Sequence, residues 1–191
     1  MNKQNKTLVF SAAILIIAAA FTRLIPHAPN FTAIGAIAIF GGSVLRDKKA
    51  AFLFPLAALI LSDICLQLFT PIKGFYGISQ FFVYAAFIVI TALATFMKKK
   101  SVANIALAAI WSGAIFFVLS NVGVWLSSDF YPKSLNGLAA CMYAAIPFYK
   151  QELFSSFLLN TIMGNLFYSA LMFALYAVME KKVEMKKHAI A

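Results

Sequence analysis

The side chains best suited to chemistry in this chain are a few polar residues set inside long apolar segments. Asp63 stands among leucines and isoleucines, and Gln67 follows it one helical turn later. A carboxylate in such surroundings is costly to bury, so it needs an internal partner or a bound molecule. Arg23 and His27 are the candidate partners. The pattern is consistent with a structural ion pair and with contact to a ligand.

Other polar side chains fall at the same depth as Asp63. Projecting each predicted helix at about 1.5 Å per residue places them near one boundary of the membrane, which we take as the outer one. Polar and aromatic groups above an apolar floor favour a small-molecule pocket. Capping by Asn30, snorkelling by Arg23 and interfacial anchoring by Trp125 are alternative roles. The predicted ligand-binding residues are Arg23, His27, Asn30, Asp63, Gln67, Gln80, Asn121, Trp125 and Asn160.

Motifs of familiar enzymes do not occur in the sequence. It has no Walker A run, no HExxH, no GxSxG and no Rossmann glycine pattern. We therefore predict no catalytic residue, no cofactor and no metal site, and a protein that is not an enzyme. Two alternatives are weaker: His27 and Asp63 as a proton-transfer pair without a nucleophile, and Cys65 as a ligand to a soft metal such as corrinoid cobalt, without a second ligand.

The amino-acid composition indicates whether this chain folds in water or in a lipid bilayer. Of its 191 residues, 63% are hydrophobic and only 12% are charged, which is too much apolar surface for a small water-soluble core. The net charge of +10 comes from short basic clusters between apolar runs, a pattern that reflects membrane topology and not nucleic-acid binding. We predict an integral membrane protein.

The apolar runs predict one transmembrane domain over residues 1–191, an all-α bundle of six helices. Unbroken hydrophobicity favours helices over the alternating strands of a barrel. The outer connection 127–152 contains an apolar stretch, 135–148, that is too short to span and predicts an interfacial or re-entrant helix. The predicted spans are 7–25, 31–45, 50–70, 76–97, 101–126 and 153–179.

Small residues and basic residues add two further expectations. The spacings Ala38-x-x-x-Gly42 and Ala109-x-x-x-Gly113 predict close helix approach, within the bundle in the first place and with a partner subunit as the alternative. Twelve Lys and Arg residues fall on the side of the termini and four on the other side. The positive-inside rule then places both termini of this multi-pass protein in the cytoplasm.

Six short motifs are distinctive: 23–32 (RLIPHAPNFT), 34–42 (IGAIAIFGG), 61–63 (LSD), 120–128 (SNVGVWLSS), 131–132 (YP) and 145–148 (AIPF). With these motifs the sequence resembles, over nearly the whole chain, an uncharacterised bacterial family of six-span membrane transport proteins. That family is similar in size, span number and topology to the substrate-binding S components of energy-coupling-factor (ECF) transporters. The first helix lacks the Ala-x-x-x-Ala spacing with which S components dock on their coupling subunit.

The resemblance implies an ECF S-component-like fold in the cell (inner) membrane and a binding subunit that takes a small nutrient, such as a vitamin, from the outer face. Its partners would be the lipid bilayer, the small-molecule substrate, a transmembrane coupling subunit and ATPases, with no nucleic acid. The main alternative is a structural membrane subunit that uses the same bundle only as a docking surface within a larger complex.

Overall fold

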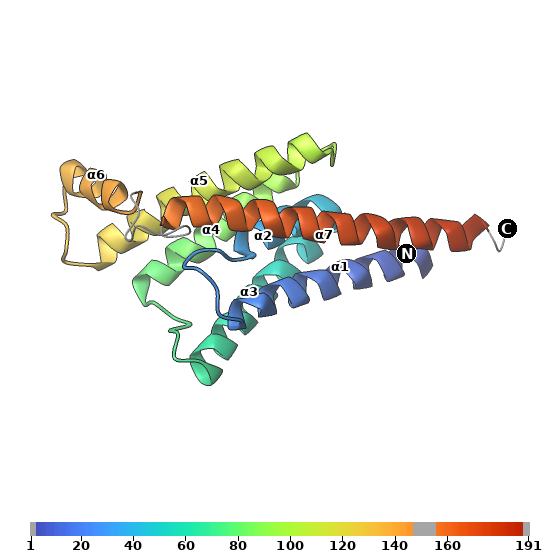
Figure 1. Cartoon of the computed structure of the whole chain (residues 1–191), viewed down its shortest axis with the longest axis horizontal. Helices are drawn as coiled ribbons and strands as arrows, with labels where there is room; N and C mark the ends of the chain where they lie inside the picture. The colour runs from blue at the N-terminus through green and yellow to red at the C-terminus, as the bar shows by residue number, and fades with distance from the viewer. Residues whose placement is uncertain (1–2, 147–155, 189–191) are drawn as a thin grey trace.

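The part of the chain that the structure describes is built from helices. The computed structural model describes residues 3–146 and 156–188, and these contain no strand. The predicted all-α class is confirmed for this part (Figure 1). The elements are α1 Lys3–Phe21, the 3-10 turn η1 Thr22–Leu24, α2 Ile34–Val44, α3 Lys48–Phe69, α4 Ile78–Ala94, α5 Val102–Ser127, α6 Leu135–Ala144 and α7 Phe157–His188.

Four of the described segments are long and apolar enough to cross a membrane: Lys6–Leu24, Lys48–Phe69, Val102–Ser127 and Phe157–Met185. They indicate a multi-pass membrane protein. Two of the predicted spans, 31–45 and 76–97, correspond to the shorter apolar helices α2 and α4. The predicted short helix in the outer connection is α6, whereas the predicted end of that connection and start of the last span, at 147–155, lie outside the described residues.

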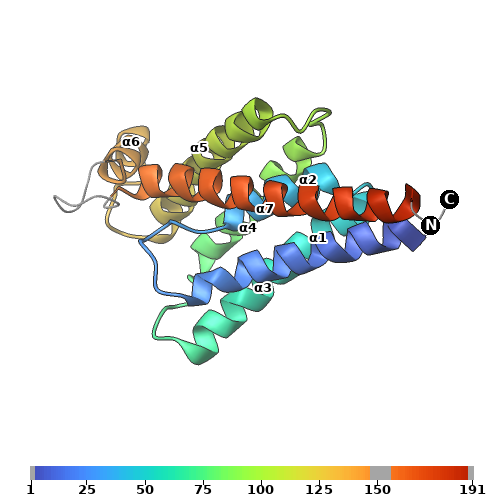
Figure 2. The ribbon, with the colours of Figure 1, turned by 45° about the vertical axis from the view of Figure 1, so that its right-hand side comes forward.

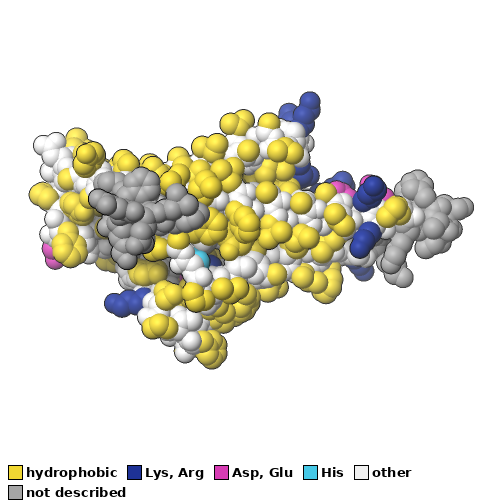
Figure 3. All heavy atoms as spheres, viewed as in Figure 1, with side chains coloured by type: hydrophobic (Ala, Val, Ile, Leu, Met, Phe, Trp, Pro, Cys, Tyr) yellow, Lys and Arg dark blue, Asp and Glu magenta, His cyan; other side chains and the backbone are white. Residues whose placement is uncertain are grey.

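The flank of the bundle is apolar. Figure 3 shows hydrophobic side chains over most of the visible face, with Lys and Arg gathered mainly toward the end that carries the termini. Phe10, Leu53, Phe81 and Leu107 are each more than 60% exposed. Large apolar side chains exposed over several helices mark a surface that contacts lipid and not water.

Both termini lie at one end of the bundle, and three connections lie at the other (Figures 1 and 2). The connections are 25–33, 70–77 and 128–134, and α6 lies at the same end. We call this end, with its three connections and α6, the distal end.

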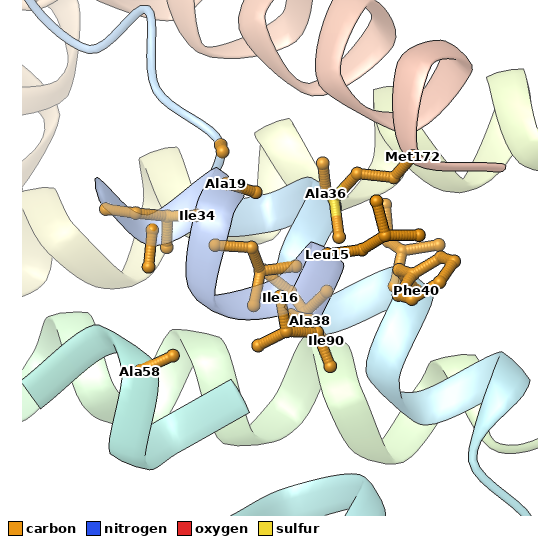
Figure 4. Close-up of a cluster of buried hydrophobic side chains, with 14 of the residues drawn as sticks. Leu15, Ile16, Ala19, Ile34, Ala36, Ala38, Phe40, Ala58, Ile90 and Met172 are labelled. Atoms are coloured by element: carbon orange, nitrogen blue, oxygen red, sulfur yellow. The ribbon is translucent and has the colours of Figure 1, made fainter. Parts of the chain in front are cut away.

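The short helix α2 forms the centre of the fold. Nine of its 11 residues are buried, and it packs against α1, α3, α4, α5 and α7. Figure 4 shows Ile34, Ala36, Ala38 and Phe40 among apolar side chains of neighbouring helices. At about 1.5 Å per residue α2 is about 16 Å long, roughly half of a hydrocarbon core. The non-helical segment 25–33 leads into it from the distal end.

Glycines let helices approach closely at both of the predicted small-residue spacings. A Cβ atom on Gly42 would lie 2.4 Å from the backbone oxygen of Thr91 in α4. One on Gly113 would lie 2.8 Å from Cγ1 of Ile162 in α7. The expectation of close packing within the bundle is confirmed at both positions.

Candidate functional site

A cavity of about 660 Å³ opens at the distal end of the bundle. Its lining combines the 25–33 connection and the first residue of α2 with side chains from α3, α4, α5, α6 and α7. Most of the exposed lining surface is apolar, and polar side chains from several elements also reach the cavity. This is the composition of a site for a small organic molecule.

An ion pair stands beside the cavity. Arg23, on η1, donates from NH1 to Oδ1 of Asp63 at 2.5 Å and to Oγ of Ser62 at 2.6 Å. Arg23 is 9% exposed and Asp63 is fully buried. Of the two partners that the sequence left open for Asp63, the structure selects Arg23. The pair joins η1, which follows α1, to α3 and places two opposite charges side by side inside the apolar bundle.

The second carboxylate oxygen of Asp63 is also occupied. Nε2 of Gln80 and the hydroxyl of Tyr84, both on α4, donate to Oδ2 at 2.8 and 2.9 Å. The carboxylate therefore ties η1, α3 and α4 together, and it does not line the cavity itself. The bond from Nε2 to Asp63 fixes the orientation of the Gln80 side chain. Its other amide atom, Oε1, is buried and has no hydrogen-bond partner among the described residues.

Five of the nine predicted ligand-binding residues line the cavity: Arg23, His27, Asn30, Gln80 and Asn121. Their selection rested on projected depth alone, and the structure brings them together from η1, the 25–33 connection, α4 and α5. Asp63, Gln67, Trp125 and Asn160 lie at the same end without lining the cavity. The ligand-binding role of all nine stays a prediction.

Three of the four residues outside the lining, Gln67, Trp125 and Asn160, have a structural role. Each holds one distal connection to a helix by a hydrogen bond. Oε1 of Gln67 accepts from the Gly74 amide at 3.1 Å and holds the 70–77 connection. Nε1 of Trp125 donates to the carbonyl of Pro132 at 2.8 Å and holds 128–134. Nδ2 of Asn160 donates to the carbonyl of Pro29 at 2.8 Å and holds 25–33. These contacts set the shape of the cavity mouth.

His27 presents a defined face to the cavity. Its Nδ1 lies 2.6 Å from the carbonyl oxygen of Ile25, so Nδ1 carries the proton that this contact requires. In the neutral ring Nε2 is then an acceptor. Both oxygens of Asp63 are bonded to other groups, and Nδ1 of His27 bonds to Ile25, so the structure does not join His27 and Asp63 as a proton-transfer pair.

Cys65 does not line the cavity. In the described part of the chain, no group of three or more His, Cys, Asp or Glu side chains is arranged to hold a metal ion.

The prediction from sequence omitted several cavity residues because they are aromatic or hydroxylic, types that also occur throughout lipid-facing surfaces. Phe117 precedes the predicted Asn121 by four residues, about one helical turn, and that spacing could have placed it on the same face. Tyr76 precedes the predicted Gln80 by four residues, so the predicted span 76–97 offered the same signal, although in the structure Tyr76 lies in the 70–77 connection. The omitted polar and aromatic residues are Thr32, Tyr76, Ser79, Phe116, Phe117, Ser120, Tyr131, Cys141, Phe157 and Thr161.

Cys141, on α6, offers a reporter for the cavity wall. It is 3% exposed, and its Sγ lies 3.6 Å from the carbonyl oxygen of Asn121. Burial raises the pKa of this thiol, with Lys133 acting in the opposite direction. The reactive thiolate is therefore scarce near neutral pH.

We expect slow maleimide labelling of Cys141 in a Cys65→Ser variant at pH 7, with a rate that rises as the pH approaches the raised pKa. The measurement is labelling rate against pH, followed by mass spectrometry of the intact protein. As a control, Asp129→Cys, at an exposed position of the 128–134 connection, is placed in a chain without other cysteines and should label fast at pH 7. Equal rates for the two thiols at pH 7 would contradict the burial of Cys141.

Comparison with known proteins gives one match. A family of unknown function, DUF6580, matches residues 2–188. No curated protein and no solved structure matches the chain.

Proposed function

Because the chain belongs to DUF6580, a family of unknown function, its activity has to be inferred from its own site, and we propose a substrate-binding membrane subunit. It takes a small nutrient, such as a vitamin, from the outer face of the membrane into the distal cavity. The observation that carries this proposal is the cavity itself. Its volume of about 660 Å³ lies within the range of roughly 300–1,000 Å³ that is usual for small-molecule sites.

The proposed topology has six spans and resembles that of ECF S components. In it, α2 completes the second crossing together with 25–33, and α4 forms the fourth crossing. Both termini are cytoplasmic and the distal end faces outward. The count of twelve Lys and Arg residues against four supports this orientation in the inner membrane. The cavity then opens toward the side from which nutrients arrive.

Release of the nutrient inward requires a second conformation. Below the cavity, α2 and its neighbours form a packed, largely apolar core that a bound molecule has to pass. The sequence has no nucleotide-binding motif, so the energy for the change comes from partners, a transmembrane coupling subunit and ATPases. Binding and energy supply are thus assigned to different chains.

Blocking the cavity tests this function. Val83, on α4, lines the cavity, whereas Val89 on the same helix is 40% exposed on the flank. We expect protein purified in mild detergent from cells grown on rich medium to carry a near-stoichiometric small molecule, identified by mass spectrometry after denaturation. Val83→Phe should lose this molecule because the new ring occupies its space. Val89→Phe, the matched control, should retain it.

Two results would overturn the proposal. One is native protein that carries no small molecule. The other is a molecule that Val83→Phe retains as fully as the native chain, since it would then lie outside the cavity. Empty protein that co-purifies with stoichiometric partners, none of them an ATPase, would favour the structural subunit.

A further inference from the structure

Arg23 has unused hydrogen-bond donors at the cavity. A guanidinium group carries five N–H donors, and NH1 supplies the bonds to Ser62 and Asp63. The other two nitrogens, Nε and NH2, bond to no group among the described residues. Arg23 lines the cavity, and about a tenth of its side-chain surface remains exposed. One edge of the guanidinium is thus held by the protein and the other is left for a bound molecule.

The ion pair does not neutralise that outer edge completely. Asp63 shares its charge among three donors, because Gln80 and Tyr84 bind Oδ2 while Arg23 binds Oδ1. Tyr76, in the cavity wall, does not add a second anion. Burial raises the pKa of this phenol, with Arg23 opposing and Asp63 adding to the shift, so it is protonated at neutral pH. The outer edge of Arg23 therefore keeps part of its positive potential.

The start of α2 adds positive potential to the same cavity. Ile34, its first residue, lines the cavity, and Ala33 at the N-cap provides no side-chain hydrogen bond. The first amides of a helix have no partner within the helix, and the helix dipole places about half a positive charge at this end. Half-helices that begin at membrane depth bind anionic substrate groups in this way.

The rest of the cavity suits an uncharged body. Apart from Arg23, no Lys or Arg lines it within the described residues. Leu66, Val83, Phe116 and Phe117 provide apolar and aromatic walls. One guanidinium edge and one helix end match a planar, singly charged group better than a phosphate, which needs more donors to offset its charge.

We propose that the ligand of this cavity is a monocarboxylate with an apolar or aromatic body. Its carboxylate accepts from Nε and NH2 of Arg23 and lies near the start of α2, and its body packs against the aromatic wall. This inference rests on the proposed binding function and specifies the substrate class.

The test uses the molecule released from the purified native protein. On treatment with a carboxylate-methylating reagent, we expect one methyl ester to form, so that the mass of the molecule rises by one CH2 unit. In Arg23→Lys the charge and the pairing with Asp63 are kept, but the planar fork is lost. We expect the purified Lys variant, stripped and reloaded with the same molecule, to bind it at least ~10-fold more weakly, the loss of about one charge-assisted hydrogen bond.

The outcomes separate this inference from the proposed function. A released molecule that has no carboxylate but is lost from Val83→Phe overturns the monocarboxylate and leaves the binding subunit standing. Full affinity in a folded Arg23→Lys variant also overturns the role of Arg23 in binding a carboxylate and leaves the binding subunit standing. Native protein without any released molecule overturns both. Should Arg23→Lys not fold, the neutral pair Arg23→Gln/Asp63→Asn replaces it, and full affinity in that variant again contradicts the role of Arg23.

Discussion

Replacing Asp63 by alanine is expected to destabilise the protein by about 3–5 kcal/mol, the usual cost of leaving one member of a buried ion pair without its partner. The guanidinium of Arg23 would remain buried beside Ser62, and Gln80 and Tyr84 would lose their common acceptor. Unfolding in mild detergent, followed by circular dichroism, gives the measurement. Asp129→Ala, which removes an exposed carboxylate, is the matched control and should change stability little.

A double variant shows whether the charge is the cause. Arg23→Gln/Asp63→Asn removes both charges and keeps groups that can hydrogen-bond to each other. It should be more stable than Asp63→Ala because no charge is left uncompensated. If Asp63→Ala unfolds at the same temperature as the native chain, the ion pair does not hold η1, α3 and α4 together.

The second large effect is expected at Gly42, where alanine should destabilise although it is the better helix former. A glycine inside a helix normally costs about 0.5–1 kcal/mol relative to alanine. Here the added Cβ atom would lie 2.4 Å from the Thr91 carbonyl oxygen and 2.8 Å from Cβ of Ala94. Since a backbone atom cannot move aside alone, α2 and α4 must separate, at a cost of about 1–3 kcal/mol. Thermal unfolding of Gly42→Ala measures it.

The reverse substitution on the lipid-facing side provides the control. Ala57 is an exposed position within α3. Ala57→Gly should destabilise by the ordinary helix-propensity difference, so the two positions should respond with opposite preferences for glycine and alanine. Stabilisation by Gly42→Ala would show that α2 and α4 are not in the close contact described.

The long helices were predictable because the length and uniformity of an apolar run are local properties. The predicted span 50–70 corresponds to Lys48–Phe69, and 101–126 to Val102–Ser127. The start of the second helix, three residues later than predicted, was not predictable in this way. Residues 31–33 are flanked by apolar side chains, yet helix begins only at Ile34, and the non-helical segment is held by the contact of Asn160 with Pro29.

The candidate site was also predictable only in its local properties. Projection along each helix gives depth, and depth correctly assembled Arg23, His27 and Gln80 at one end. It gives no information on the direction of a side chain around its helix or on its partner in another segment. Asn160 therefore could not be distinguished from a ligand contact, because its partner Pro29 is 131 residues away in sequence.

The small size of α2 has a consequence for biosynthesis. An 11-residue segment is too short to be integrated into a bilayer as an independent span, which requires about 20 apolar residues. In the proposed topology the basic cluster at Arg46, Lys48 and Lys49 must nevertheless stay in the cytoplasm while α3 is inserted. The synthesising ribosome therefore delivers α2 before its packing partners in α4, α5 and α7 exist. The second crossing is completed late, when the newly made helices close around it.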